Sequence, residues 1–223
     1  MKKQRRSKRS TGKSSSQSRV YGFGVVLIVS IVLFGFYRAG NRSPSETVTE
    51  QRLSDNPGKG ASDAAVTIVE FGDFGCTACK AWYQAGILDQ ILLQYGDKVR
   101  LEWRDFPIIT PYSPKAAEAG QCAYDQGKFW EFHDITFERA PALRVNDLQA
   151  NAAEIGLDVD AFSQCLDSAK HQSTVDLDLQ QAYGLGLRGT PSFTINGEPI
   201  IGPTPERMVA LIDAALAATE ATP

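Results

Sequence analysis

Two cysteines three positions apart are the residues of this sequence with the clearest chemical potential. Cys76 and Cys79 enclose Thr77-Ala78 and follow an apolar run that ends in a glycine-bracketed turn. If Cys76 opens a helix, Cys79 lies one turn further on, close enough for a disulfide. Unpaired backbone N–H groups and the helix dipole favour a thiolate at such a position. The pattern predicts redox chemistry, with Cys76 as the exposed sulfur that is attacked.

Other uses of a C-x-x-C pair are half of a zinc site or a structural disulfide. Zinc would need a second close ligand pair, and the remaining cysteines, Cys122 and Cys165, are 43 positions apart. We expect no metal ion and no cofactor. In an exported protein these two spare thiols should form a structural Cys122–Cys165 disulfide, and two buried free cysteines are the alternative.

The segments around the cysteine pair alternate between strand and helix patterns. Residues 64–71 form an apolar, β-branched run, residues 77–95 repeat apolar side chains at helical spacing up to Gly96, and residues 99–104 alternate as a strand with one solvated face. This order predicts the front half of a thioredoxin-like α/β unit. Glu70 lies inside the first strand. It either faces outward on a half-exposed strand or lies beneath the cysteines, where it can accept or relay the proton of Cys79.

A helical stretch separates this front half from the return to the sheet. Ser113 as N-cap and Pro114 at the first helical position open it, and the pattern continues to about residue 184. The chain then returns through Thr190-Pro191 to a short strand, an Asn196-Gly197 hairpin turn and a final amphipathic helix over 204–218. We expect Pro191 to follow a cis bond, with a trans proline on an edge strand as the alternative.

The N-terminal part of the chain has the features of a membrane anchor. Eighteen uncharged residues separate Arg19 from Arg38, and as a helix they span about 27 Å, close to the hydrocarbon core of a bilayer. Eight Lys and Arg residues precede them in residues 1–19, which predicts a cytoplasmic N-terminus and an exported remainder. A cleaved signal peptide is the alternative. Residues 39–60 are polar and predict a flexible linker.

Charge argues against a nucleic-acid partner. From Ala39 onward the chain has 14 basic residues and all 26 of its acidic ones. An acidic folded part does not complement a phosphate backbone. The partner predicted for residues 20–38 is a lipid bilayer.

Taken together, the Cys76/Cys79 pair, the Thr190-Pro191 turn before a hairpin and the helical insertion between them resemble the DsbA family of the thioredoxin superfamily. The resemblance covers about residues 61–218, and the stretch Gly127-Lys128-Phe129-Trp130-Glu131-Phe132-His133 resembles a motif frequent in its membrane-anchored bacterial branch.

The resemblance implies a thioredoxin fold with an inserted helical domain, a cis bond before Pro191, and Thr190 and Pro191 as a client-binding loop beside the cysteines. It also implies that Glu70 is the buried acid of the family. The implied activity is oxidation of exported proteins with free cysteines, with recharging by a quinone-linked membrane partner of the DsbB or VKOR type. The dipeptide Thr77-Ala78 departs from both the Pro-His of the strongest oxidants and the Gly-Pro of thioredoxins.

The predicted organisation is a basic cytoplasmic head (1–19), one transmembrane helix (20–38), a linker (39–60), a thioredoxin-like domain (61–110 and 185–223) and an inserted helical domain (111–184). The predicted function is an extracytoplasmic thiol–disulfide oxidoreductase that donates the Cys76–Cys79 disulfide. A reductase or isomerase of the same fold and a peptide-binding chaperone are the alternatives. We expect His133 to be a helix-surface or core-edge residue without a chemical role, and Phe74 to be exposed client-binding surface.

Overall fold

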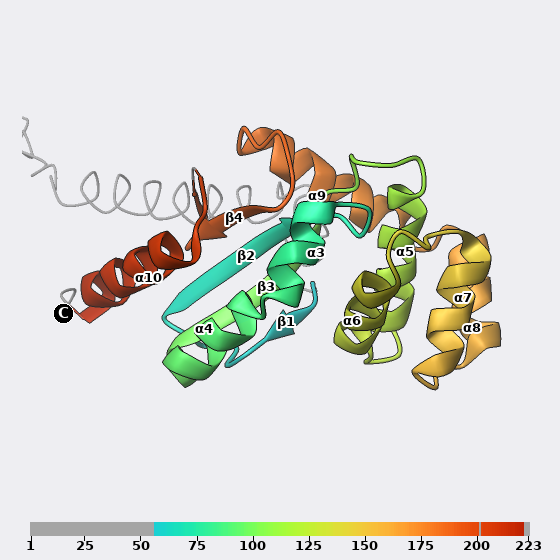
Figure 1. Cartoon of the computed structure of the whole chain (residues 1–223), viewed down its shortest axis with the longest axis horizontal. Helices are drawn as coiled ribbons and strands as arrows, with labels where there is room; N and C mark the ends of the chain where they lie inside the picture. The colour runs from blue at the N-terminus through green and yellow to red at the C-terminus, as the bar shows by residue number, and fades with distance from the viewer. Residues whose placement is uncertain (1–55, 201, 221–223) are drawn as a thin grey trace, which may run out of the picture. The chain divides into compact units, whose positions relative to one another are not determined.

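The computed structural model describes residues 56–200 and 202–220, which belong to one compact unit. Strands and helices alternate in its first part, helices follow one another in its middle, and a hairpin and a helix close it (Figure 1). The elements are β1 (Gly58–Lys59), β2 (Val66–Gly72), α3 (Thr77–Gln84), α4 (Ile87–Tyr95), the short 3₁₀ helix η1 (Gly96–Lys98), β3 (Val99–Asp105), α5 (Ser113–Tyr124), α6 (Phe129–Arg139), α7 (Val145–Glu154), α8 (Val159–Asp167), α9 (Gln172–Gly184), β4 (Ser192–Ile195), β5 (Glu198–Pro199) and α10 (Pro205–Glu220).

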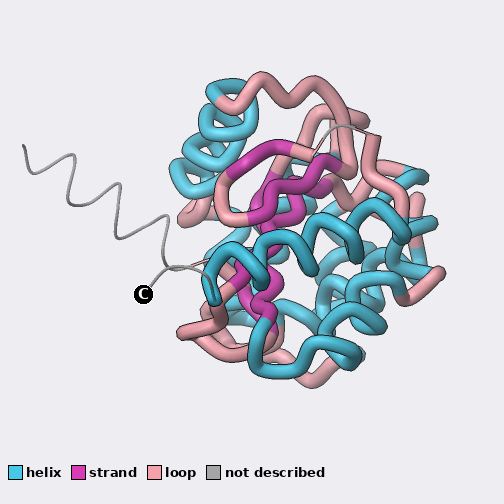
Figure 2. Tube along the Cα trace, turned by 90° about the vertical axis from the view of Figure 1, so that its left-hand side faces the viewer, coloured by secondary structure: helices cyan, strands magenta, loops and turns pink. Residues whose placement is uncertain are grey.

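The sheet has the strand order β1-β3-β2-β4-β5, with β2 and β3 parallel and the other neighbours antiparallel. Its strands, magenta in Figure 2, run among the helices. Side chains alternate along β2, because successive residues of a strand point to opposite faces. Val66 and Ile68 pack in a core with residues of α4 and α10, whereas Phe71 packs in a second core with Ala182 of α9. The central strand is therefore covered on both faces, as the thioredoxin-like α/β prediction requires.

The helices α5 to α8 gather at one end of the sheet (Figure 1). They enclose a third core, in which Phe132, Phe137, Leu148 and Phe162 are almost completely buried. Trp103 of β3 belongs to the same core, so the helical segment packs directly against the end of the sheet. Phe129 of α6 is also buried in this core, whereas Trp130 is half-buried and packs against it.

Three sequence expectations need correction. The helix predicted over 77–95 is two helices, because Gly86 adopts a left-handed conformation (φ 63°) between α3 and α4. Gly58 and Lys59, placed in the linker, pair with β3 as the edge strand β1. Ser113 is the first residue of α5 and not its N-cap.

The solvated face predicted for β3 is also wrong at its end. Arg104 is 6% exposed and approaches Asp178 of α9 with its guanidinium at 3.6 Å. The Asp178 carboxylate accepts a hydrogen bond from the backbone N–H of Asp105 at 3.0 Å. Helix α9 therefore covers the strand face whose alternating charges looked solvent-exposed in the sequence.

The predicted anchor, residues 20–38, lies outside the described residues, as do the basic head and most of the linker. Within the part of the chain that the structure describes, none of the helices has both the length and the apolar composition needed to cross a bilayer.

Candidate active site

The turn between β2 and α3 is held by one buried carboxylate. Asp73, 2% exposed, accepts hydrogen bonds from the backbone N–H groups of Gly75 (2.7 Å), Ile108 and Ile109 (both 2.8 Å). The same side chain thus fixes the cysteine turn and the loop after β3. Gly75 allows this close approach, because a Cβ there would lie 2.8 Å from Ser113 Oγ. The arrangement sets the position at which Cys76 enters the helix.

Cys76 is the N-cap residue of α3. Its backbone is extended (φ −86°, ψ 121°), and its Sγ accepts a hydrogen bond from the backbone N–H of Cys79 at 3.4 Å. An N-cap side chain normally satisfies one of the unpaired N–H groups of the first helical turn, and here the acceptor is a sulfur. The N–H groups and the helix dipole both favour negative charge at this atom. The sequence prediction that Cys76 opens the helix is confirmed.

Thr190, 114 positions downstream, is in contact with Cys76. The peptide bond between Thr190 and Pro191 is cis, and the Cys76 thiol donates to the carbonyl oxygen of Thr190 at 3.1 Å. The turn before β4 is therefore in direct contact with the cysteine, as the resemblance implies.

The two cysteines have opposite acid strengths. The hydrogen bond from the Cys79 side chain to Cys76 is the largest cause that lowers the pKa of Cys76. Burial opposes it, and further hydrogen bonds from Thr190 and from backbone N–H groups add to it, so that the pKa is about 5. Burial, followed by that same hydrogen bond and the nearby Glu70, raises the pKa of Cys79. One thiolate and one thiol therefore coexist at neutral pH in the reduced pair.

Glu70 lies on the same face of β2 as Val66 and Ile68 and is 5% exposed. The half-exposed, outward-facing position considered from the sequence is therefore wrong. Burial and, secondly, the charge of Cys76 raise the pKa of Glu70 to about 8. Glu70 and Cys79 line a common cavity of about 30 Å³, which has room for a water molecule. The carboxyl group is thus protonated near neutral pH and shares a cavity with the cysteine that needs a proton.

Two expectations about exposure fail. Cys76 is 6% exposed and not freely accessible, because it is enclosed by its own helix start and the Thr190 turn. Phe74 is 1% exposed and stacks on Trp103 at a ring-centroid distance of 5.3 Å. It is a core residue that joins the cysteine turn to the helical segment, and not client-binding surface. Its aromatic neighbours Trp103, Phe132 and Phe137 come from later parts of the chain.

Asp73 is the residue of the site that sequence reasoning missed. Its signal was present in the stretch Gly72-Asp73-Phe74-Gly75, because Asp next to glycine after a strand is typical of a turn in which the side chain bonds nearby backbone N–H groups. Its bonds to Ile108 and Ile109 had no such signal, since they depend on tertiary packing.

The other predicted residues lie in the helical segment. Cys122 of α5 and Cys165 of α8 form a disulfide, whereas Cys76 and Cys79 are free. His133 is 7% exposed, and its Nδ1 is 2.8 Å from the Asp134 carboxylate. Burial lowers its pKa despite this bond. A core-edge position was one of the two expected for it.

Comparison with known proteins places this geometry in a family. The sequence model of the family described as Thioredoxin matches residues 54–214. Among solved structures, a thioredoxin-like oxidoreductase from Silicibacter pomeroyi is 27% identical, with a TM-score of 0.65 over 73% of this chain and 93% of that one. Oxidised BdbD from Bacillus subtilis is 24% identical, with a TM-score of 0.67 over 74% and 95% of the two chains.

The thiol–disulfide exchange protein alpha-DsbA2 from Wolbachia pipientis is 22% identical, with a TM-score of 0.64 over 78% of this chain and 99% of that one. Among curated sequences, a Na(+)/H(+) antiporter NhaA from Herminiimonas arsenicoxydans is 36% identical over 154 residues. That match includes 69% of this chain but 24% of the antiporter. The chain thus spans about a quarter of the length of the curated relatives it matches.

Proposed function

The chain belongs to the thioredoxin family and has the fold of its DsbA-like thiol–disulfide oxidoreductases, and on that premise we propose that it donates the Cys76–Cys79 disulfide to proteins outside the cytoplasm. The observation that carries the proposal is the contrast between the two sulfurs. Cys76 has its pKa lowered to about 5 at a helix start, while the pKa of the adjacent Cys79 is raised.

The exchange proceeds in two steps. A client thiolate attacks Sγ of Cys76 in the oxidised pair, so that a client–Cys76 bond forms and the Cys76–Cys79 bond breaks. Cys79 leaves and takes a proton, for which the protonated carboxyl group of Glu70 is the donor in their common cavity. A second client thiolate then attacks the client sulfur of the mixed disulfide, and Cys76 departs as the stabilised thiolate. The client loses two electrons, and the cysteine pair gains them.

Thiolate stability sets the direction of this exchange. Thioredoxin has a cysteine pKa of about 7 and a potential of about −270 mV. Compared with thioredoxin, a pKa of about 5 at Cys76 stabilises the reduced form at pH 7 by about 2 kcal/mol more. This difference corresponds to about 50 mV in redox potential. The account therefore predicts a potential of about −220 mV or higher.

The test is the redox potential of the full-length chain, equilibrated with glutathione, together with oxidation of a reduced model client. A potential near −220 mV or above, with client oxidation, supports disulfide donation. A potential near −250 mV or below, with rapid insulin reduction, would assign the chain to the reductases instead. Unchanged activity of Cys76→Ser in oxidative refolding would favour a peptide-binding chaperone.

The clients proposed are exported proteins with free cysteines, which bind along the Thr190-Pro191 turn, where backbone edges are next to Cys76. Each turnover leaves the cysteine pair reduced, so a membrane partner must recharge it. The resemblance points to a quinone-linked reoxidase of the DsbB or VKOR type. Oxygen- and quinone-dependent reoxidation of the chain in isolated membranes tests this partner.

An extracytoplasmic location fits the Cys122–Cys165 disulfide, because structural disulfides persist in oxidising compartments. Residues 20–38 would then anchor the chain in the cell membrane with residues 1–19 in the cytoplasm. Protease digestion of intact spheroplasts should release the catalytic part, and the mass of the membrane-extracted protein should include residues 1–19. A mature N-terminus after residue 38 would show a cleaved signal peptide.

A further inference from the structure

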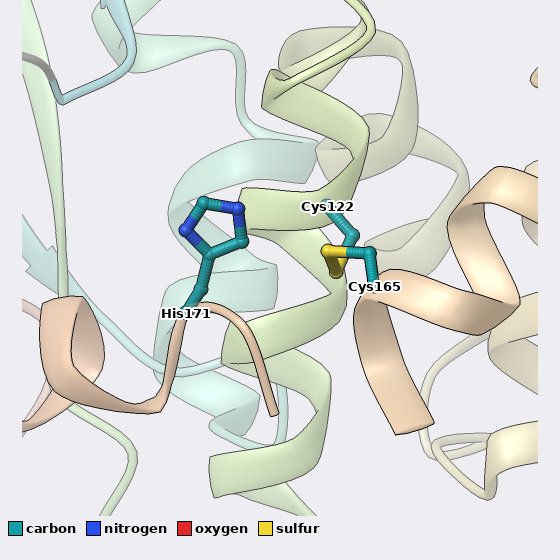
Figure 3. A group of neighbouring side chains, drawn as sticks. All are labelled: Cys122, Cys165 and His171. Carbon is teal, nitrogen blue, oxygen red and sulfur yellow. A yellow bond between two sulfur atoms is a disulfide. The ribbon is translucent and has the colours of Figure 1, made fainter. Parts of the chain in front are cut away.

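A group of metal-binding side-chain types, separate in its residues from the Cys76 site, lies in the helical segment (Figure 3). Cys122 comes from α5, Cys165 from α8 and His171 from the turn before α9. One ligand atom of each lies within 4.8 Å of the others. Two helices and the turn before a third therefore bring two sulfurs and an imidazole nitrogen to one place.

Asp125 adds an oxygen to this group. Its Oδ2 is 2.7 Å from Nε2 of His171 and 3.8 Å from Sγ of Cys165. It also accepts a hydrogen bond from Lys170 Nζ at 2.7 Å. The carboxylate therefore contacts both other kinds of donor.

The redox state decides whether this group can hold a cation. In the structure the two sulfurs are bonded to each other, and a metal is bound by thiolates. A dithiol reductant transfers two electrons to the bond, which breaks to leave two thiols, while the two sulfurs of the reductant become a disulfide. A divalent metal then displaces one proton from each thiol.

The donor set matches zinc. Zinc takes four ligands in a tetrahedron, with bonds of about 2.3 Å to sulfur and about 2.0–2.2 Å to nitrogen and oxygen, so its ligand atoms lie roughly 3.3–3.8 Å apart. After reduction the two sulfurs, which are bonded to each other in the disulfide, must separate to about 3.8 Å. The His171 nitrogen, which lies within 4.8 Å of both sulfurs, must approach them by up to about 1 Å. Lys170, whose side chain is 57% exposed, can swing into solvent and leave the Asp125 oxygen to the metal.

We propose that reduction of the Cys122–Cys165 disulfide creates a zinc site in which Cys122, Cys165, His171 and Asp125 are the four ligands. The metal then joins α5, α8 and the start of α9 in place of the disulfide. The inference goes beyond disulfide donation and does not depend on it, because no atom of the Cys76 site takes part. It adds a site to a sequence in which we expected no metal.

The test uses the full-length chain with Cys76→Ser and Cys79→Ser, so that the C-x-x-C pair cannot bind the metal. The chain is reduced with a phosphine under inert gas, freed of reductant and titrated with Zn²⁺ against a chromophoric chelator. We expect one zinc per reduced chain and none per oxidised chain. Co²⁺ in place of Zn²⁺ should give the absorption of a tetrahedral thiolate complex. Equal binding by both redox forms would overturn the proposal.

Substitutions of two residues beside the cysteines distinguish a four-ligand site from zinc binding by the two thiols alone. His171→Ala should weaken zinc binding by at least about 10-fold, and Asp125→Asn should weaken it less. Lys170→Ala, the matched control, should bind zinc equally or more tightly because it removes a competing cation. Equal affinity of the His171 and Lys170 variants would overturn the proposal. Helicity by circular dichroism adds a second readout, because zinc should restore any helix that reduction loses, and failure to do so counts against the site.

Discussion

The chain holds two pairs of cysteines in different physical settings. Cys76 and Cys79 are three positions apart, both are free, and Cys76 caps a helix, where the Cys79 side chain and, to a smaller extent, backbone N–H groups stabilise its thiolate. Cys122 and Cys165 are 43 positions apart and bonded. Cys122 is fully buried in α5, and Cys165 Sγ is 3.8 Å from the Asp125 carboxylate. The comparison teaches that local electrostatics, and not the residue type, separates a reactive pair from a structural one.

The largest expected effect comes from removing Cys76, the attacked sulfur of the first pair. Cys76→Ser should reduce oxidation of a model client to the rate of the uncatalysed reaction, because it removes the sulfur that the client attacks. The double variant Cys122→Ala and Cys165→Ala should keep its rate within about threefold. Rates are measured by the loss of client thiols. Comparable losses in both variants would contradict the division between the pairs.

The second pair should matter for stability instead. Removing the Cys122–Cys165 bond, which closes a loop of 43 positions, should lower the free energy of unfolding by about 4 kcal/mol on the chain-entropy estimate. Denaturant unfolding of the oxidised chain and of the Cys122→Ala, Cys165→Ala variant gives the difference. Cys76→Ser in its reduced form is the control and should change stability far less. A loss below about 1 kcal/mol would show that the disulfide is not a structural link.

The buried Glu70 beside the reactive cysteine pair should make the stability of the chain depend on pH. Its pKa is raised from 4.5 to about 8 by burial and by Cys76. The stability that a raised acid contributes is fully present below pH 4.5 and is lost as the pH rises through about 8. The variant Glu70→Gln should therefore be more stable than the parent by on the order of 4 kcal/mol at pH 8, and equally stable at pH 4.

The measurement is denaturant unfolding of the reduced chains at both pH values, with the exposed Glu131→Gln as control. Glu70→Gln should also slow client oxidation about 100-fold if Glu70 supplies the proton of Cys79. A stability difference that does not depend on pH would show that Glu70 is not held in its neutral form.

The smallest effect concerns the turn that positions Cys76. Asp73→Asn keeps the size of the side chain but weakens its hydrogen bonds to Gly75, Ile108 and Ile109, and should destabilise the chain by about 1–3 kcal/mol. The pKa of Cys76 should rise as the turn loosens. Thermal unfolding and pH-dependent alkylation measure the two effects. Asp63→Asn, at an exposed position, should change neither.

The sequence predicted those parts of the fold that rest on local pattern. The β-C-x-x-C-α-β order and the Asn196-Gly197 turn follow from short motifs with a steric or electrostatic cause. The position of the Thr190 turn beside Cys76 was implied by the resemblance to the DsbA family. The burial of Phe74 and Arg104 could not be read in this way. Whether a strand face is solvated depends on α9 and on the helical segment, whose positions are set by packing across the whole chain.

The division of residues 77–95 into two helices shows a second limit of prediction from sequence periodicity. Residues 77–95 repeat apolar side chains at helical spacing through Gly86, so periodicity alone indicates one helix. A glycine inside such a pattern permits a left-handed residue but does not demand it. The bonds of Asp73 to Ile108 and Ile109 are likewise a tertiary feature.

The ionisation of Cys76 in the reduced chain tests the central claim most directly. The Cys122–Cys165 disulfide removes two of the four cysteines from the titration, so thiolate absorbance and alkylation rate report Cys76 and Cys79 alone. The account predicts one thiolate that forms with an apparent pKa of about 5 and a second cysteine that is still a thiol at about pH 9. A first ionisation above about pH 7.5 would contradict it, because the helix start would then give Cys76 no advantage over an ordinary thiol.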